Sequence, residues 1–299
     1  MQKEVYLNFL KFEKRYSANT VRAYHKDLDQ FYLFFCLSEN DIQDLEKLDS
    51  KDIRSWIVQL MKTVSARTVK RKLASVNGFF MYLKKNNILY HNPLDKVQKP
   101  KTKNILPEFI PEKSMQNVTR LFSKDTDNFS AIRDFLVIEL LYSTGIRQAE
   151  LIGLKHADID KGQKQLKVSG KRNKERIIPI AANIIKLIDK YICLKSGNNF
   201  SCGNNQPLLI TDSGNKMYPS FVYKKVHHYL GQVSSMKKRS PHILRHSFAT
   251  HMLNHGADLN AIKELLGHAN LAATQVYTHN SFEQLIKTYN KAHPRAGTN

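Results

Sequence analysis

The sequence predicts a mainly α-helical protein of two domains, with a small antiparallel β-hairpin in the second. Three observations carry this prediction. Apolar residues recur at three- and four-residue steps along most of the chain, as on one face of an α-helix. Prolines and lysines cluster over residues 91–112 and divide the helical pattern. A short alternating apolar pattern within residues 166–180 is typical of paired strands.

The first domain is predicted to be all helical. Ser17 and Ser65 each precede an amphipathic stretch, and a serine hydroxyl there can accept a backbone N–H of the first helical turn. The apolar residues after the two serines are Val21, Tyr24, Leu28, Phe31 and Phe35, and then Val69, Leu73, Val76, Phe80 and Leu83. Two long helices are therefore expected, each beginning after one of these serines.

The second of these helices carries a basic face opposite its apolar face. Seven basic residues and no acidic residue lie between Lys62 and Lys85. Solvation alone explains most charged helix faces. Here two small residues on the same face, Ala74 and Gly78, would permit close approach to a groove of DNA, so we expect DNA contact. The residues expected to make it are Arg67, Lys70 and Arg71.

The segment that divides the domains is rich in proline and lysine. Four of the nine prolines fall within residues 91–112, which excludes a regular helix there. Its lysines would keep an extended segment solvated or against phosphates. We therefore expect an N-terminal domain over residues 1–98, a basic linker over 99–110 and a C-terminal domain over 111–299.

The second domain is expected to be helical with one interruption. An apolar helix over residues 131–142 ends in Ser-Thr-Gly, and a new helix follows over 146–154. Residues 166–180 then predict a β-hairpin with its turn at 170–174.

Further along this domain, helix-boundary residues frame two candidate side chains. Ser240 followed by a proline predicts a helix start, which places His242 and Arg245 one turn apart on one face. Asp258 predicts another helix start, and Gly267 predicts the end of that helix.

The charge balance indicates a polyanionic partner. Forty-seven Lys and Arg residues oppose 26 Asp and Glu residues, a formal net charge of +21 in 299 residues. Nucleic acid and an anionic membrane surface would both suit such an excess. No apolar run approaches the roughly 20 residues of a membrane span, and the first residues do not resemble a signal peptide. Double-stranded DNA in the cytoplasm is the simplest interpretation.

The cysteines and histidines give no indication of a metal centre. Cys36, Cys193 and Cys202 are odd in number and lack metal-ligand spacing, which fits a reducing cytoplasm. No His, Cys and Asp grouping suggests a metal site. No cofactor is expected.

One ordered set of residues suits attack by a protein hydroxyl on a DNA phosphate. That reaction requires a nucleophile, cations that neutralise the non-bridging oxygens, and groups that move protons. Arginine matches phosphate geometry, lysine and histidine can transfer protons, and tyrosine can hold the phosphate covalently. Glu150 would hold the guanidinium of Arg147 from the side that faces away from the phosphate. The set is Arg147, Lys171, His242, Arg245, His268 and Tyr277.

Each member of the set has an ordinary explanation when taken alone. Arg147 could be a surface arginine, Lys171 one cation of a basic turn, and Tyr277 one of thirteen core or surface tyrosines. A His-x-x-Arg step alone is expected roughly half a time by chance in a chain of this length. A histidine 23 residues after Arg245 and a tyrosine nine residues later make coincidence implausible.

The segments around these residues resemble the tyrosine recombinase (phage-integrase) family, and its Xer branch in particular. They are residues 143–151 (STGIRQAEL), 170–176 (GKRNKER), 242–251 (HILRHSFATH), 266–268 (LGH) and 276–279 (VYTH). The resemblance runs over essentially the whole chain. It implies an N-terminal core-binding (SAM-like) DNA-binding domain and a C-terminal catalytic domain.

The resemblance also implies roles for the individual residues. Tyr277 would be the nucleophile that forms a 3′-phosphotyrosyl link, while Arg147 and Arg245 clamp the scissile phosphate. Lys171 would protonate the leaving 5′-oxygen. The two histidines of the set would donate hydrogen bonds to the phosphate, and His242 could also accept the tyrosine proton.

Two segments depart from the family pattern. Arg172 stands where a small residue is expected, and Leu271-Ala272-Ala273-Thr274 replaces a more Ser/Thr-rich stretch before the tyrosine. The first departure could change contacts within the basic turn, and the second could change how the tyrosine segment is held. Arg172 and Lys174 are also expected to contact DNA.

The implied activity is site-specific DNA recombination without metal or ATP. The enzyme would act as a homotetramer, or as a heterotetramer with a paralogous recombinase, in chromosome dimer resolution, with a septal DNA translocase as a further partner. An integrase of a mobile element shares this chemistry, although the nearness of the first domain to Met1 favours the Xer role. The alternatives from other classes are an inactive architectural DNA-binding protein and a metal-dependent transposase.

The C-terminal tail has an amphipathic pattern of its own. Phe282, Leu285, Ile286 and Tyr289 lie at helical spacing. Such a short stripe often packs on its own domain. Related recombinases pass this segment to the neighbouring subunit, so the resemblance implies that residues after about 281 dock in trans.

Overall fold

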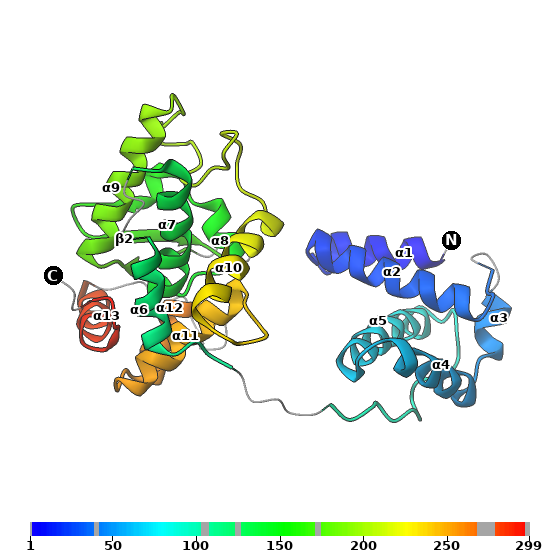
Figure 1. Ribbon diagram of the computed structural model, residues 1–299. Coiled ribbons are helices and arrows are strands. Elements are labelled where there is room, and N and C mark those ends of the chain that lie inside the picture. The colour runs from blue at the N-terminus through cyan, green and yellow to red at the C-terminus, as the bar shows by residue number, and fades with distance from the viewer. Residues whose placement is uncertain are drawn as a thin grey trace. The chain divides into compact units, whose positions relative to one another are not determined.

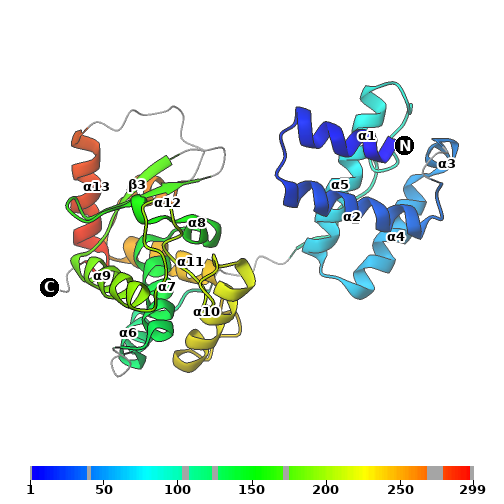
Figure 2. The same ribbon diagram turned by 90° about the horizontal axis from the view of Figure 1, so that it is seen from above.

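The computed structural model describes residues 2–38, 42–102, 108–122, 127–170, 175–267 and 279–296, with the backbone alone for 279–284. The chain divides into two compact units, Met1–Ile105 and Leu106–Asn299. Both are mainly helical, and the second holds a small antiparallel sheet (Figures 1 and 2). The predicted fold class is therefore confirmed. The division falls within the expected linker, whose residues 103–107 lie outside the described part.

The N-terminal unit consists of helices joined by short turns. Its elements are α1 (Gln2–Asn8), the π-helical turn η1 (Phe9–Glu13), α2 (Ala18–Phe34), α3 (Ile42–Lys47), α4 (Ser50–Thr63) and α5 (Ala66–Lys85). The Ser17 hydroxyl accepts the N–H of Thr20, and the Ser65 hydroxyl accepts the N–H of Thr68. Both predicted helix starts are therefore confirmed, because each serine satisfies a backbone donor that the helix leaves unpaired.

The apolar faces of α2 and α5 form the core of this unit. Phe31 of α2 and Phe80 of α5 are fully buried, with ring centroids 5.9 Å apart. Trp56 of α4 meets the Phe31 ring edge-on at 5.1 Å. Such edge-to-face contacts add about 0.5–1.5 kcal/mol to the burial itself. The aromatic cluster therefore fixes α4 against the pair formed by α2 and α5.

Gly78 of α5 serves packing within the protein. A Cβ atom at this position would lie 2.6 Å from the hydroxyl oxygen of Tyr6 in α1. The expectation that Gly78 opens the basic face to DNA is therefore wrong, because α1 occupies the space that the missing side chain leaves. Ala74, one turn earlier, is exposed.

The C-terminal unit surrounds one long buried helix. Its elements are α6 (Glu112–Leu121), α7 (Phe129–Thr144), α8 (Gln148–Gly153), the 3-10 turn η2 (His156–Asp158), β1 (Ile159–Asp160), β2 (Gln165–Ser169), β3 (Glu175–Pro179), α9 (Ala182–Gly197), α10 (Pro219–Val233), α11 (Pro241–Asn254), α12 (Leu259–Leu266) and α13 (His279–Ala292). Every residue over 136–146 is buried. This stretch spans the end of α7, which packs against α9, α10 and α11. An apolar surface on all sides is expected of a helix with neighbours on all sides.

The sheet has the order β1-β2-β3, and both pairs are antiparallel. Leu166 pairs with Ile178 and Val168 with Arg176, and these four side chains are buried. The predicted hairpin is confirmed. The sheet also contains a third strand, β1, which is too short at two residues to show a pattern in the sequence. Residues 171–174 of the turn lie outside the described part of the chain.

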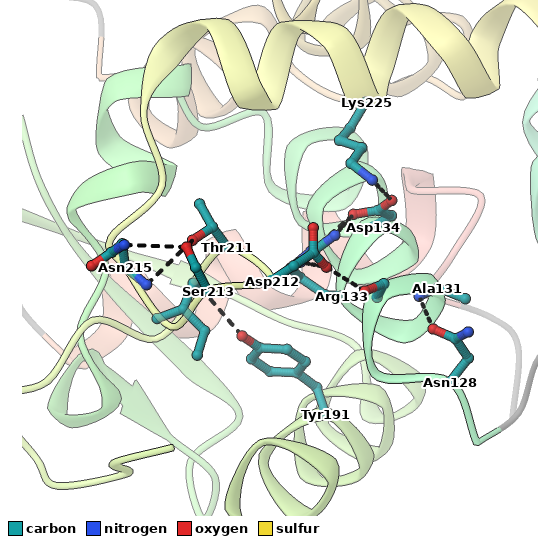
Figure 3. A network of polar contacts seen from close by, with 12 residues as sticks. Asn128, Ala131, Arg133, Asp134, Tyr191, Thr211, Asp212, Ser213, Asn215 and Lys225 are labelled. Atoms are coloured by element: carbon teal, nitrogen blue, oxygen red, sulfur yellow. Dashed lines mark hydrogen bonds and ion pairs between the residues drawn. The ribbon is translucent and has the colours of Figure 1, made fainter. Parts of the chain in front are cut away.

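A buried ion network joins the start of α7 to α10 (Figure 3). Arg133 is fully buried and donates to Asp134 at 2.8 Å and to Asp212 at 2.7 Å. Its guanidinium lies 4.9 Å from the centre of the Phe221 ring, and Lys225 of α10 pairs with Asp134 at 2.7 Å. Burial alone would lower the pKa of Arg133, but the two carboxylates raise it. Arg133 therefore stays charged, and the network fixes the register of the two helices.

The tail packs on its own unit. Leu285 and Tyr289 of α13 are buried, and the Tyr289 ring stacks on His293 with a centroid distance of 5.1 Å. Beyond the helix, Arg295 donates to the Glu139 carboxylate at 2.8 Å. In the single chain these side chains complete its own core, and docking of residues after about 281 on a neighbouring subunit stays a prediction.

Arg295→Ala is expected to destabilise the C-terminal unit by roughly 3–5 kcal/mol, because it leaves the buried Glu139 carboxylate unpaired. Burial already raises the pKa of Glu139, against the opposing effect of Arg295. Adding Glu139→Gln removes the buried charge and should recover part of the loss. Urea denaturation followed by circular dichroism measures the effect.

The matched control for this variant is Lys291→Ala, at an exposed position of the same tail. Its effect should stay within about 0.5 kcal/mol. An Arg295→Ala protein that unfolds at the same urea concentration as the wild type would contradict the importance of the Arg295–Glu139 pair.

Candidate active site

The end of α7 places the first guanidinium of the candidate site. Gly145 closes α7 in the left-handed conformation, with φ +60°. A Cβ atom there would lie 2.6 Å from the Phe248 ring and 2.8 Å from Leu266, so only glycine fits. Ile146 is then buried, and Arg147 becomes the N-cap of α8 with a side chain that is 39 % exposed. The buried isoleucine thus turns the next side chain outward.

Glu150 of α8 joins two arginines. Its carboxylate accepts the backbone N–H of Arg147 at 2.8 Å, as in a capping box, and also the side-chain Nη1 of Arg147 at 2.8 Å. Arg176 of β3 donates to both carboxylate oxygens, at 3.1 and 2.8 Å. Burial alone would raise the pKa of Glu150, but the hydrogen bonds from Arg176 and Arg147 lower it to about 2. Glu150 is therefore ionised at neutral pH.

The second predicted arginine, Arg245, comes from α11. It donates to the carbonyl of Gly145 and, at 2.7 Å, to that of Leu266. Arg147 donates to the carbonyl of Gly267 at 3.3 Å. Both side chains thus meet at the C-terminal end of α12, whose last carbonyls carry partial negative charge.

The arrangement concentrates positive charge. Burial and the neighbouring Arg147 lower the pKa of Arg245 to about 10. Arg245 therefore remains charged at neutral pH, but its charged form is disfavoured relative to an arginine in water. A bound anion would relieve this repulsion, so the geometry and the electrostatics both suit a phosphate.

His242 lies on α11 three residues before Arg245 and is exposed. Helix α11 starts at Pro241 after Ser240, as predicted, although the Ser240 side chain makes no cap hydrogen bond. Gly267 closes α12 in the left-handed conformation with φ +65°, which confirms the predicted end of that helix.

Five residues of the predicted site lie outside the described part of the chain: Lys171, Arg172, Lys174, His268 and Tyr277. Their described neighbours frame them. Ser169 of β2 pairs with Glu175 of β3 on either side of the turn, and Gly267, the C-cap of α12, directly precedes His268. The structure therefore brings together Arg147, Glu150 and Arg245, and the roles of the other residues stay predictions.

Sequence reasoning assigned no role to Arg176, the third guanidinium at this site. Its side chain is 6 % exposed and shares the inward face of β3 with Ile178. The signal was present in the alternation, because Arg176 occupies a core position of a strand. A buried guanidinium at such a position requires an acceptor of opposite charge.

A second cationic region lies near the start of α5. Arg67 is exposed and Lys70 partly exposed. The Arg71 side chain is 48 % exposed, yet its guanidinium is held by the buried carboxylate of Asp27 in α2, with Nη2 at 2.9 Å. Lys72 donates to the same carboxylate at 3.0 Å. Arg71 is therefore fixed in position while part of its side chain faces solvent.

The described residues contain neither a metal-binding cluster nor a membrane-spanning helix. No group of three or more His, Cys, Asp or Glu side chains in that part of the chain is arranged to hold a metal ion. No helix within the same residues is long and apolar enough to cross a membrane.

Both units match known protein families. Residues 113–284 match the phage integrase family, and residues 4–87 match the N-terminal SAM-like domain of phage integrases. Tyrosine recombinase XerC of Chlorobaculum parvum is 36% identical, over 98% of this chain and 94% of the relative. Tyrosine recombinase XerC of Thermodesulfovibrio yellowstonii is 37% identical, over 97% of this chain and 95% of the relative.

Solved structures share the fold. The XerH site-specific recombinase bound to palindromic difH substrate, in a post-cleavage complex, gives a TM-score of 0.71 at 23% identity, over 89% of this chain and 78% of that chain. The Tn1549 transposon integrase in complex with transposon right end DNA gives 0.70 at 19% identity, over 95% and 99%. From the matched family and the full-length relatives it follows that the chain belongs to the phage integrase family and is a tyrosine recombinase.

Proposed function

We propose that this tyrosine recombinase cuts and rejoins duplex DNA at a specific site through a 3′-phosphotyrosyl intermediate. The observation that carries the proposal is the meeting of Arg147 and Arg245 at the end of α12. The next residues in the chain lead from His268 to Tyr277. A scissile phosphate has two non-bridging oxygens, and two guanidinium groups from different helices suit them. We call Arg147 and Arg245 the phosphate clamp.

In the proposed first step, the hydroxyl oxygen of Tyr277 attacks phosphorus. A bond forms between that oxygen and phosphorus, and the bond from phosphorus to the 5′-oxygen breaks. The tyrosine proton passes to a base, for which His242 is the candidate, and Lys171 protonates the leaving 5′-oxygen. The phosphate clamp stabilises the negative charge that develops on the non-bridging oxygens.

In the proposed second step, the 5′-hydroxyl of another duplex attacks the phosphotyrosine. One phosphate ester is exchanged for another in each step, so the number of ester bonds is unchanged. The reaction therefore needs no energy from ATP. Because cationic side chains supply the charge and the proton, it needs no metal ion either.

The proposed biological role is chromosome dimer resolution, which the XerC names of the full-length relatives support. Two pairs of strand exchanges would take place in a tetramer, of identical chains or of this chain and a paralogue. A septal DNA translocase is proposed as a further partner. Integration of a mobile element is the alternative, and the DNA site that the protein cuts distinguishes the two roles.

The N-terminal unit is proposed to hold DNA through its cationic region. Arg67 and Lys70 would contact phosphates, and Asp27 would preorganise Arg71 for the same task. In the C-terminal unit, Arg172 and Lys174 of the turn are proposed to contact DNA beside Lys171. The charge excess of +21 supports a polyanionic partner of this kind.

Tyr277→Phe is expected to abolish the covalent adduct and to leave DNA binding nearly unchanged, because it removes one hydroxyl and no cation. The assay mixes the protein with fragmented genomic DNA of its source organism and resolves adducts on a denaturing gel. Sequencing the trapped DNA then gives the site. Trapped DNA from a single chromosomal locus would support dimer resolution, and trapped DNA from the ends of a mobile element would support integration.

The matched control is Tyr218→Phe, which changes an exposed tyrosine of the same unit and should leave the adduct yield intact. An adduct that persists with Tyr277→Phe would refute the nucleophile assignment. Wild-type protein that forms no adduct with any genomic DNA would refute the proposed function as a whole.

Replacing Arg67 and Lys70 together by alanine should weaken DNA binding and flatten its salt dependence. Each lost phosphate contact reduces the slope of log K against log salt by about one unit, so a loss of up to about two units is expected. The control is Lys84→Ala with Lys85→Ala, which removes two exposed charges from the other end of α5. Equal slopes for the two double variants would mean that only total charge matters.

A further inference from the structure

Three consecutive carbonyl groups at the end of α12 are each bound by a different arginine. The pairs are Arg176 with Leu265 at 2.8 Å, Arg245 with Leu266 at 2.7 Å, and Arg147 with Gly267 at 3.3 Å. The carbonyls in the last turn of a helix lack partners within the helix, and cations near them are stabilised. Two of these arginines form the phosphate clamp, and the third requires an explanation of its own.

The guanidinium of Arg176 is buried and fully hydrogen-bonded, whereas the Arg147 side chain is partly exposed to solvent. The Arg176 side chain is 6 % exposed, and all three of its guanidinium nitrogens have acceptors, two on Glu150 and one on Leu265. The Arg147 side chain is 39 % exposed and makes a single side-chain hydrogen bond to Glu150. Arg176 thus takes two of the four hydrogen bonds that the Glu150 carboxylate accepts, and the backbone N–H and the Nη1 of Arg147 take the other two.

The division of Glu150 between two arginines matters because a carboxylate competes with phosphate. A two-pronged pair is the preferred geometry of arginine with either anion. Without Arg176, Glu150 could bind both Nη groups of Arg147. A phosphate would then have to break that pair before the clamp could close on it.

We propose that Arg176 is a positioning residue for the phosphate clamp: by binding Glu150 through two hydrogen bonds, it leaves Arg147 available to the scissile phosphate. This inference rests on the proposed function and adds a residue that does not touch DNA. Gly267 supports it, because a Cβ atom there would approach the Arg176 guanidinium to 3.1 Å. The glycine at the end of α12 therefore leaves room for this arginine.

Arg176 also ties the hairpin to the clamp. It is the second residue of β3 and pairs with Val168 of β2, next to the Ser169–Glu175 pair that precedes the turn. The turn carries Lys171, the proposed acid. Anchoring of β3 to Glu150 and α12 therefore sets the position of the strand that leaves this turn.

The test uses Arg176→Met, which keeps the length and the apolar stem of the side chain but removes its charge and donors. The substrates are two duplexes that carry the site recovered from the covalent adducts, with either a natural phosphate or a methylphosphonate at the scissile position. The methylphosphonate is uncharged and depends less on a cationic clamp. We expect cleavage of the natural phosphate to slow about 10- to 100-fold, with binding and methylphosphonate cleavage nearly unchanged.

Two further variants separate positioning from folding. Arg176→Met combined with Glu150→Gln should cleave no more slowly than Arg176→Met alone, because a neutral amide no longer withdraws Arg147. Arg176→Lys keeps the charge and one hydrogen bond and should recover part of the rate. The matched control is Lys167→Met, which removes an exposed charge from β2 of the same hairpin and should cleave like the wild type.

Equal losses on the two substrates would overturn the proposal, as would a double variant that loses the product of the two single effects. If Arg176→Met melts below the assay temperature, Arg176→Lys decides, with a loss expected on the natural phosphate only. Wild-type protein that cleaves, together with an Arg176→Met protein that cleaves equally well, would refute the positioning role alone. Wild-type protein that forms no adduct would refute the recombinase function itself.

Discussion

Mutual repulsion of like charges is the constraint around which the catalytic unit is arranged. Arg147, Arg176 and Arg245 come from α8, β3 and α11, and the end of α12 is their common partner. Glu150 and the partial charges of the helix carbonyls hold them together before DNA is bound. Groups fixed in this way need no reorganisation as charge develops on phosphate, which is the condition for electrostatic catalysis.

Buried ion pairs also occur away from the candidate site, where they join helices to one another. Asp27 joins α2 to α5 through Arg71 and Lys72, and Arg133 joins α7 to α10 through carboxylates. Buried ion pairs contribute little net stability, because desolvation opposes their attraction. They do penalise wrong pairing strongly, since a displaced partner leaves a buried charge alone. In each unit the apolar core supplies the stability and a polar network fixes the register.

The features that local chemistry decides were predictable from sequence. Helix starts at Ser17 and Ser65 and the helix end at Gly267 depend on hydrogen bonds within a few residues. Spacing also singled out Arg147 and Arg245, which lie about a hundred residues apart and meet at one helix end. That the two guanidinium groups lie together at the end of α12 could be seen only in the three-dimensional structure.

What could not be predicted depends on partners distant in the chain. The space beside Gly78 belongs to Tyr6, and the tail side chains belong to the core around α7. Arg176 had no predicted role, because its acceptors, Glu150 and Leu265, are 26 and 89 residues away. Sequence periodicity locates a buried position but does not identify what faces it.

Gly145 has a consequence for how such a site can change over evolutionary time. A side chain there would meet Phe248 and Leu266 and would also strain the left-handed backbone. Making room would require smaller residues on α11 and at the end of α12, the two elements that hold Arg245 and its acceptor. Any side chain at this position therefore clashes unless Phe248 and Leu266 shift or change as well. Changes at this corner of the enzyme are therefore expected to arise as coupled substitutions at Gly145, Phe248 and Leu266.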